Sequence, residues 1–244
     1  MFQKNTLKNG LRLITVPLKN TQTVTVLVLV GVGSKYEKKD INGISHFLEH
    51  MFFKGTKKRP THQDVAETLD KIGGEYNAFT GEEYTGYYAR VEASHFNLAI
   101  DWVSDILINS TLPLKQIEKE KKVIVEEINM YLDNPMAYVQ SLWRTALYGD
   151  QPAGRDIAGT KKAVKAMTKG KLVNYRNEHY IANNALVCIA GKIENKNLLQ
   201  ETEKHFHFLK NKKRKKNPKL KKARKSQKFF YTKNKPTKLI CAWE

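Results

Sequence analysis

The sequence predicts an α+β fold, a two-layer domain with a mainly antiparallel sheet and helices packed on one face. Segments with strand patterns lie toward both ends of the chain, and segments with the periodicity of helices occupy its middle. No internal repeat is visible. This grouping favours two packed layers over a repeated βαβ array.

The first two predicted strands form a hairpin. Residues 2–7 and 11–16 are short mixed strands that flank Asn9-Gly10, a strong signal for a two-residue turn. The segment after the hairpin alternates as a half-buried strand does and contains several valines. Beyond the hairpin, the predicted strands span residues 21–32, 75–80, 84–91 and 185–190.

The predicted helices begin and end at residues that suit helix termini. Thr61 and Ser94 are good N-cap residues, and Pro113 and Pro135 are placed where proline opens a helix. Gly55 ends the first helix. The helices span residues 43–54, 61–72, 94–109, 113–133, 135–147 and 195–209, with shorter ones before and around Tyr175.

The composition, with 41% hydrophobic and 27% charged residues, is that of a globular chain whose 244 residues bury one substantial core. No apolar segment approaches the length of about 18 residues that crosses a membrane, and residues 1–16 lack the apolar region of a signal peptide. Cys188 and Cys241 are isolated and form no disulfide framework or thiolate metal site. We therefore expect a cytoplasmic protein.

The net charge of +19 is concentrated near the C-terminus. Residues 204–243 contain 16 of the 43 Lys and Arg and no Asp or Glu, so the rest of the chain, with 27 basic and 24 acidic residues, is nearly neutral. The block at 210–228 repels itself, which predicts a disordered basic linker. A surface for RNA, anionic lipid or an acidic protein is the alternative, although the aromatic residues at 229–231 follow the block and are not interleaved with it.

The segment His46-Phe47-Leu48-Glu49-His50 carries the strongest chemical signal. Residues four apart are neighbours on a helix, so His46 and His50 can bind one metal ion, with Glu49 beside them. H-x-x-E-H is the inverted zincin motif, in which the two histidines bind Zn²⁺ and the glutamate is the general base. The alternative is a surface helix with two polar histidines and a solvated glutamate.

A catalytic zinc site needs a third protein ligand, and the helix at 113–133 is the best source. At about 100° per residue, with Ile117 at 0°, Glu127 falls at about 280° and Glu120 at about 300°, beside the apolar face, whereas Glu126 falls at about 180°, toward solvent. We therefore predict Glu127 as the ligand and Glu120 as a supporting catalytic residue that orients it or balances its charge. The alternative is that both are half-exposed acids paired with Lys121 or Lys122.

Four segments resemble the pitrilysin-type zinc peptidases, which include insulin-degrading enzyme and the mitochondrial processing peptidase. They are GISHFLEHMFFKGT (43–56), GGEYNAFTGEEYTGYYARV (73–91), KEKKVIVEEINMYLDNP (119–135) and YRNEHYIANNALVCIAG (175–191). The similarity spans nearly all of residues 1–200 in the same order. Glu127 lies 77 residues after His50, a spacing that matches the family, so the resemblance and the helix angles select the same carboxylate.

The resemblance implies that residues 1–209 form the catalytic half-domain, that 210–228 link it onward, and that 229–244 begin a truncated second half or form a tail. It also implies a partner, a homologous metal-free half or subunit, that encloses a chamber for unfolded peptides. The substrate would lie as an added strand along Asn77, Ala78, Phe79 and Thr80. The residues alone show only an amphipathic strand there. The length leaves open a fragment, a single-domain subunit or a degenerate product.

We therefore expect a zinc-dependent endopeptidase that hydrolyses unfolded peptides or presequence-like segments, with His46, His50 and Glu127 on the metal and Glu49 as general base. Its activity is expected to depend on a second homologous half. One alternative is a non-catalytic structural or processing-complex subunit of the same fold. A second is a nucleic-acid-binding protein that uses residues 210–228. The other five histidines have no comparable spacing and are expected to be structural.

Overall fold

The computed structural model describes residues 1–193, 197–207 and 209–212. The predicted tail, 229–244, and all but the first three residues of the predicted basic linker lie outside the described residues. The domain boundaries proposed for this part of the chain stay predictions. The fold described below is that of the predicted catalytic half-domain.

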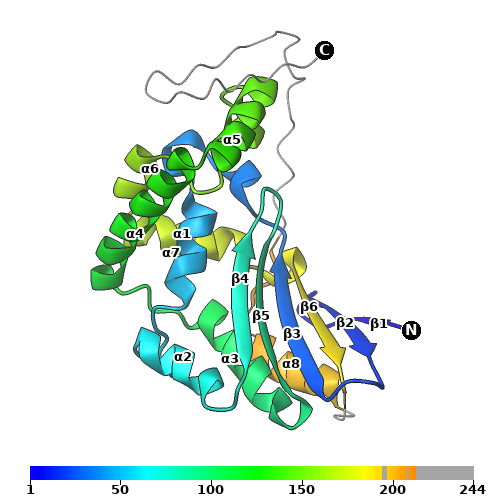
Figure 1. Ribbon diagram of the computed structural model, residues 1–244. Coiled ribbons are helices and arrows are strands. Elements are labelled where there is room, and N and C mark those ends of the chain that lie inside the picture. Colours follow the sequence, from blue (N-terminus) through cyan, green and yellow to red (C-terminus); the bar gives the residue numbers. More distant parts are fainter. Residues whose placement is uncertain (194–196, 208, 213–244) are drawn as a thin grey trace.

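A six-stranded sheet forms one layer, with the strands in the order β1-β2-β6-β3-β5-β4 (Figure 1). Neighbouring strands are antiparallel except for β2 and β6, which are parallel. The sheet is therefore mainly antiparallel, as predicted. Its strands are β1 (Gln3–Thr6), β2 (Arg12–Pro17), β3 (Thr23–Val30), β4 (Glu75–Thr80), β5 (Thr85–Glu92) and β6 (Ala185–Gly191).

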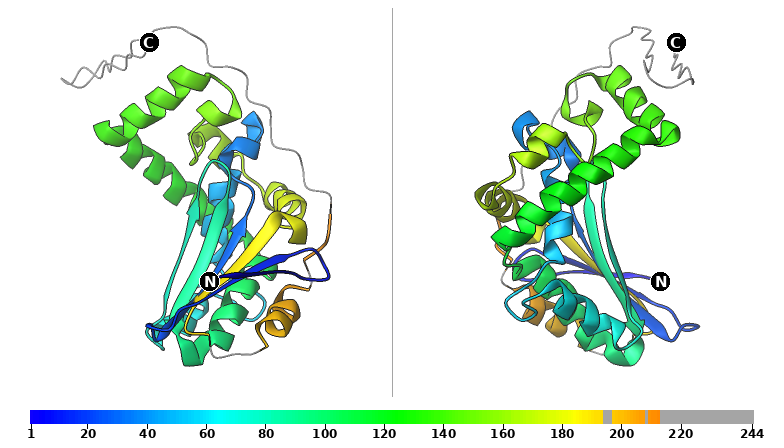
Figure 2. Two further views of the ribbon diagram at one scale, coloured as in Figure 1. Left: turned by 90° about the vertical axis from the view of Figure 1, so that its right-hand side faces the viewer. Right: turned by 60° about the vertical axis from the view of Figure 1, so that its left-hand side comes forward.

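Helices form the second layer. α1 packs against β4, and α3 packs against β3 and β5. Helices α2, α3 and α8 lie near one end of the strands, and α5 and α6 lie near the other (Figures 1 and 2). The helices are α1 (Ile44–Phe52), α2 (His62–Asp70), α3 (Phe96–Ile108), α4 (Leu114–Asp133), α5 (Pro135–Tyr148), α6 (Lys161–Lys165), α7 (Lys169–His179) and α8 (Leu198–Phe206).

The core lies between the two layers. In β3 every second residue is buried, because successive side chains of a strand point to opposite faces. Val26 faces the same side as its register partners Ala89 of β5 and Ile189 of β6, and all three are buried. Trp102 of α3 is fully buried and donates a hydrogen bond to the Val65 carbonyl of α2. One apolar face of the sheet is thus covered by helices, which confirms the predicted α+β two-layer fold.

Two local predictions differ from the structure. The hairpin turn has three loop residues instead of two, because Leu7 pairs with Leu11 and the Gly10 amide donates to the Leu7 carbonyl. Gly10 adopts a positive φ of 86°, which suits the glycine of a three-residue hairpin loop. Ser94 does not cap α3, because residues 93–95 form a 3-10 turn and the helix starts at Phe96.

Within the described residues, none of the helices combines the length and the apolar composition that a membrane span requires. The longest, α4, has twenty residues and includes a run of lysines and glutamates.

Candidate metal centre

Helix α1 presents both motif histidines to the same side. Its apolar residues Phe47, Leu48 and Met51 are fully buried, so the remaining face carries His46, Glu49 and His50. The backbone starts the helix at Gly43, whose φ of 94° is left-handed. A Cβ there would lie 2.6 Å from the Ala158 carbonyl oxygen, so glycine is needed on both counts.

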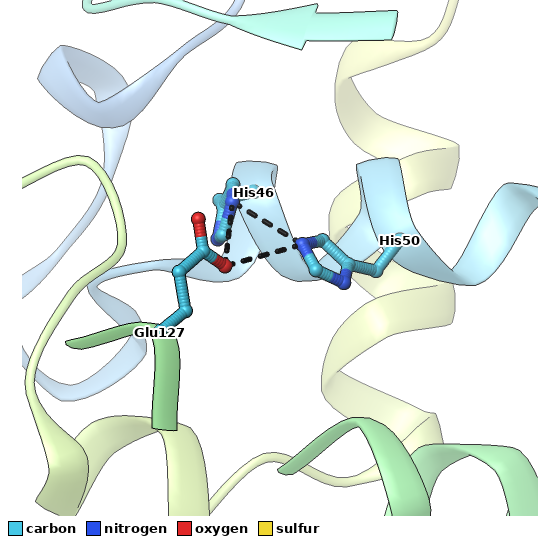
Figure 3. A group of neighbouring side chains, drawn as sticks. All are labelled: His46, His50 and Glu127. Carbon is cyan, nitrogen blue, oxygen red and sulfur yellow. Dashed lines mark hydrogen bonds and ion pairs between the residues drawn. The ribbon is translucent and has the colours of Figure 1, made fainter. Parts of the chain in front are cut away.

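Glu127 reaches the two histidines from α4 (Figure 3). Its Oε2 atom lies 3.6 Å from His46 Nε2 and 3.6 Å from His50 Nε2, and the two Nε2 atoms are 3.3 Å apart. Within the described part of the chain, His46, His50 and Glu127 form the cluster of potential metal ligands, with their ligand atoms all within 4.8 Å of one another. Glu126 is exposed, as the helix angles predicted.

The three donor atoms fit a zinc ion. Zinc bonds of about 2.1 Å at tetrahedral angles place neighbouring donor atoms about 3.4 Å apart. The separations of 3.3, 3.6 and 3.6 Å match this value. Two imidazole nitrogens and a carboxylate oxygen are also a donor set that zinc prefers, and three protein ligands leave a position for water.

Glu120 lies behind the metal ligands. It is 4% exposed, and its Oε2 atom is 3.0 Å from His50 Nδ1, the ring atom that points away from the other donors. Its second oxygen binds Lys54 Nζ at 2.9 Å. Lys121 bonds Glu118 instead, so the alternative in which Glu120 pairs with that lysine is wrong. Glu120 therefore contacts the ring of His50 and not Glu127, and its supporting role stays a prediction.

Glu49 points into the same site. The Thr80 hydroxyl at the end of β4 donates a hydrogen bond to Glu49 Oε2. Burial raises the pKa of Glu49, and the Thr80 hydrogen bond offsets only part of this rise. A carboxyl group with a raised pKa is better suited to accept and return a proton near neutral pH than an ordinary surface glutamate.

The electrostatics of the two histidines differ. Burial, together with His50, lowers the pKa of His46 to about 4. Burial also lowers the pKa of His50, but hydrogen bonds and charges of Glu120 and Glu127 outweigh it and raise this pKa to about 9. The carboxylates thus favour positive charge at the point where the donor atoms meet, as a cation site requires.

A cleft of about 650 Å³ opens beside these side chains and is lined by His46, Glu49, Thr80 and Glu127. Its other walls come from the C-terminal half of α4, from α5, and from residues 156–161. Strand β4, which contains the predicted substrate-binding residues Asn77, Ala78, Phe79 and Thr80, is the outermost strand of the sheet on this side. The structure therefore brings the end of this strand to the motif glutamate.

Sequence reasoning missed three contributors to the site. Lys54 binds Glu120, the Thr80 side chain binds Glu49, and the Tyr131 hydroxyl donates to Glu127. Lys54 and Tyr131 each lie four residues beyond a ligand, His50 and Glu127, on the same helix face or just past its end. That spacing was available in the sequence, whereas the contact between Thr80 and Glu49 depends on tertiary packing.

Two family descriptions match successive parts of the chain. The family described as Insulinase (Peptidase family M16) matches residues 12–161, and the family described as Peptidase M16 inactive domain matches residues 166–244. The chain belongs to peptidase family M16. This confirms the resemblance inferred from the sequence. The second matched region supplies β6, which lies inside the sheet between β2 and β3, so the two regions share one folded unit.

Relatives of the chain are named zinc proteases. An uncharacterized zinc protease YmxG of Bacillus subtilis is 39% identical over 206 residues, covering 84% of this chain and 50% of that protein. An uncharacterized zinc protease of Rickettsia bellii is 38% identical over 208 residues, with 85% and 50% covered. The chain therefore spans about half the length of these relatives.

Solved structures share the fold. A protease from Helicobacter pylori superposes with a TM-score of 0.84 and 27% identity, covering 93% of this chain and 55% of that one. A peptidase M16 inactive domain from Pseudomonas fluorescens has a TM-score of 0.82 at 14% identity, covering 92% and 54%, which shows the fold alone.

Proposed function

We propose that this chain is the metal-binding catalytic half of a zinc endopeptidase that acts on unfolded peptides or presequence-like segments. The proposal depends on one observation. The donor atoms of His46, His50 and Glu127 lie at the distances from one another that a zinc ion requires, and Glu49 lies beside them. Membership of peptidase family M16 and relatives named zinc proteases support it.

In this proposal, His46 Nε2, His50 Nε2 and Glu127 hold the zinc ion. When bound, zinc supplies Lewis acidity toward the scissile carbonyl and toward water. Glu49 accepts a proton from the attacking water and returns it to the leaving amine. Thr80 fixes the orientation of the Glu49 carboxylate, and Glu120 fixes the ring of His50 through Nδ1.

The open edge of β4 is the proposed substrate-binding surface. β4 pairs with β5 on one side, and the Ala78 amide is bonded to the Asn77 side chain at 2.8 Å instead of to a strand. An extended peptide that displaces this side chain would pair with the main chain of residues 77–80 and so pass Glu49. Binding by added main-chain hydrogen bonds suits peptides that are unfolded, because a folded chain has already used these groups.

A second homologous half or subunit is the proposed partner. The curated relatives are about twice as long as the matched region. Large apolar side chains are also exposed next to the cleft, on the C-terminal half of α4 and on α5; they include Met130, Leu132, Met136 and Trp143. Apolar surface of this kind is typical of a surface that contacts another protein. The expected cytoplasmic location stays a prediction.

The substitution Glu49→Gln tests the catalytic role. We expect it to keep wild-type zinc stoichiometry and to lower peptide hydrolysis by about 100- to 10,000-fold, because it removes the proton acceptor and no ligand. The measurement is zinc content by atomic emission together with cleavage of an unfolded peptide mixture, with and without a metal-free homologous partner chain. Glu126→Gln is the matched control, because that residue is exposed on α4 and should leave cleavage unchanged.

The same assay separates the alternative functions. If the wild-type chain binds zinc but cleaves no peptide with any partner, the non-catalytic subunit is favoured. If Glu49→Gln retains full cleavage, the catalytic assignment is wrong. A nucleic-acid role would instead appear as binding that weakens steeply with salt and is lost when residues 210–228 are deleted.

A further inference from the structure

Helix α1 begins without a capping side chain of its own. Gly43 occupies its N-cap position and offers no side chain, although the first turn of a helix leaves backbone N–H groups without intrahelical partners. Helix α2 shows the ordinary solution, since Thr61 and Asp64 form a capping box at its start. The metal-binding helix must therefore be capped from elsewhere.

The cap comes from Glu37, six residues before the helix N-cap. One carboxylate oxygen accepts hydrogen bonds from the Gly43 amide at 2.7 Å and from the Asn42 side chain at 3.0 Å. The other accepts a hydrogen bond from the Ser45 amide at 2.9 Å. The carboxylate also faces the positive end of the α1 dipole, which stabilises a negative charge there.

Glu37 makes these bonds while almost completely buried, at 2% exposure. Its named partners are neutral groups, so burial raises the pKa of Glu37 against the opposing effect of the hydrogen bonds from Ser45, Gly43 and Asn42. Exposed caps such as Thr61 hold a helix start without such a desolvation cost. A buried carboxylate at this position therefore indicates a requirement for fixed geometry beyond the stability of one helix.

The residue that Glu37 holds is next to a metal ligand. Ser45 precedes His46, and its hydroxyl is 2.9 Å from the Tyr175 hydroxyl of α7. Ser45 is thus fixed from two sides, through its amide by Glu37 and through its side chain by Tyr175. A metal site tolerates displacements of only about 0.5 Å, so the position of this first turn decides whether His46 Nε2 meets the other donors.

The loop that carries Glu37 is also tied to the substrate side. The Ser34 amide donates to the Gly81 carbonyl at 3.2 Å, and the Lys35 amide donates to the Glu82 carbonyl at 2.9 Å. Gly81 directly follows Thr80, whose hydroxyl binds Glu49. The same short segment, residues 34–37, therefore contacts both the start of the metal-binding helix and the end of β4.

We propose that Glu37 is a positioning residue of the metal centre, which sets the direction of His46 and His50 by fixing the first turn of α1 and its register with the end of β4. The inference rests on the zinc-binding part of the proposed function. It predicts that loss of the Glu37 carboxylate weakens zinc binding in a protein that is still folded.

The test compares Glu37→Gln with Thr61→Ala in the full chain. Both remove capping interactions of a helix, but only the first acts on the metal-binding helix. The measurements are zinc affinity, by competition with a chromophoric chelator, and the visible absorption spectrum of bound Co²⁺, at a temperature where circular dichroism shows a folded protein. We expect Glu37→Gln to weaken zinc binding by about 10-fold and to alter the Co²⁺ spectrum. Thr61→Ala should lower the melting temperature and leave both metal readouts unchanged.

Wild-type affinity and an unchanged Co²⁺ spectrum in folded Glu37→Gln would overturn the inference. If Glu37→Gln does not fold, Asn42→Ala decides, because it removes one donor to the carboxylate, together with the bond of the same amide group to the Asp156 carbonyl, and keeps the two backbone donors. A two- to threefold weaker zinc affinity for Asn42→Ala supports the inference, and wild-type affinity overturns it. A wild-type chain that binds no zinc would instead contradict the proposed function itself, so the two failures are distinguishable.

Discussion

The two helices that supply the metal ligands are held in different ways. In α1, six of the nine residues are buried, and its start is bonded to Glu37 and Tyr175. In α4, three of the twenty residues are buried, and all three precede Val125. The half of α4 that carries Glu127 lines an open cleft and exposes Met130, Tyr131 and Leu132.

This difference separates a fixed part of the site from an adaptable part. The histidines stand on a helix whose opposite face, with Phe47, Leu48 and Met51, is packed in the core, so the helix cannot move without disturbing that packing. Glu127 stands on a helix segment with few buried contacts, which is the kind of segment that opens locally at low free-energy cost. If the proposed partner covers the exposed apolar side chains of α4, it would also restrict the motion of the segment that carries Glu127.

The largest effect is expected from the ligand on the exposed helix. Glu127→Gln should weaken zinc binding by more than about 100-fold, because it replaces a charged donor with a neutral one at the centre of the site. Glu126→Gln, one residue earlier and exposed, should bind zinc as the wild type does. Chelator competition measures both. Equal zinc affinities for the two variants would show that Glu127 is not a ligand, and α4 would then contribute no ligand to the metal site.

A smaller effect on zinc affinity is expected from Glu120, which contacts His50 of α1. Glu120→Gln should weaken zinc binding by about 10- to 100-fold, because the His50 ring loses the carboxylate that orients it and strengthens its Nε2 atom as a metal donor. Lys54→Met, which removes only the next partner in this chain of contacts, should have a weaker effect in the same direction. If Lys54→Met weakens zinc binding more than Glu120→Gln does, Lys54 does not act on His50 through Glu120, and the proposed sequence of contacts is wrong.

The end of β4 offers a test that leaves the metal alone. Thr80→Val should lower kcat for peptide cleavage by about 10-fold, since a hydrogen bond to a charged group is worth about 1.5 kcal/mol or more. Zinc affinity should not change. Thr25→Val on β3, outside the cleft, is the control. A loss of zinc binding in Thr80→Val would show that this strand supports the ligands and not Glu49.

The packing around α1 also predicts a dependence on pH. Burial lowers the pKa of His179 on α7 from 6.5 to about 4, and its ring packs against Tyr175, which binds Ser45. The folded protein keeps this histidine neutral where the unfolded chain takes up a proton. The stability is therefore complete above pH 6.5 and is lost as the pH falls toward 4.

His179→Gln removes this proton uptake. Between pH 7 and 5.5, the unfolding free energy of the wild type should fall by about 1 kcal/mol more than that of the variant. Urea unfolding at the two pH values, with metal removed from both proteins, measures the difference. Parallel pH dependence in the two proteins would show that His179 is not shielded from water in solution.

Local patterns predicted the fixed part of the site better than the adaptable part. The spacing of His46, Glu49 and His50 is a property of one helix, and the angle of Glu127 follows from the apolar face of another, so both were available from the sequence. On the same projection with Ile117 at 0°, Tyr131 falls at about 320°, within the apolar face, but it is 46% exposed. The angular argument finds the apolar face and cannot tell whether this chain or another protein covers it.

The contacts missed from the sequence depend on distant segments. Glu37 lies in the segment between β3 and α1, and Thr80 is the last residue of β4, so both reach α1 only through the folding of the sheet, and no periodicity encodes such contacts. The hairpin turn was predicted at the right residues with the wrong length, because the sequence Asn-Gly suits more than one loop type and the Leu7–Leu11 pairing decided between them.

The position of β6 has a consequence for how the protein is made. β6 lies between β2 and β3, and Arg12 is in register with Leu186, so the N-terminal hairpin has no neighbour in the sheet until the chain has been synthesised beyond Gly191. An isolated two-stranded hairpin is marginally stable in water. Residues 1–17 therefore have no stable partner strand early in synthesis. The sheet forms completely only when β6 inserts between β2 and β3, which makes these contacts long-range in sequence.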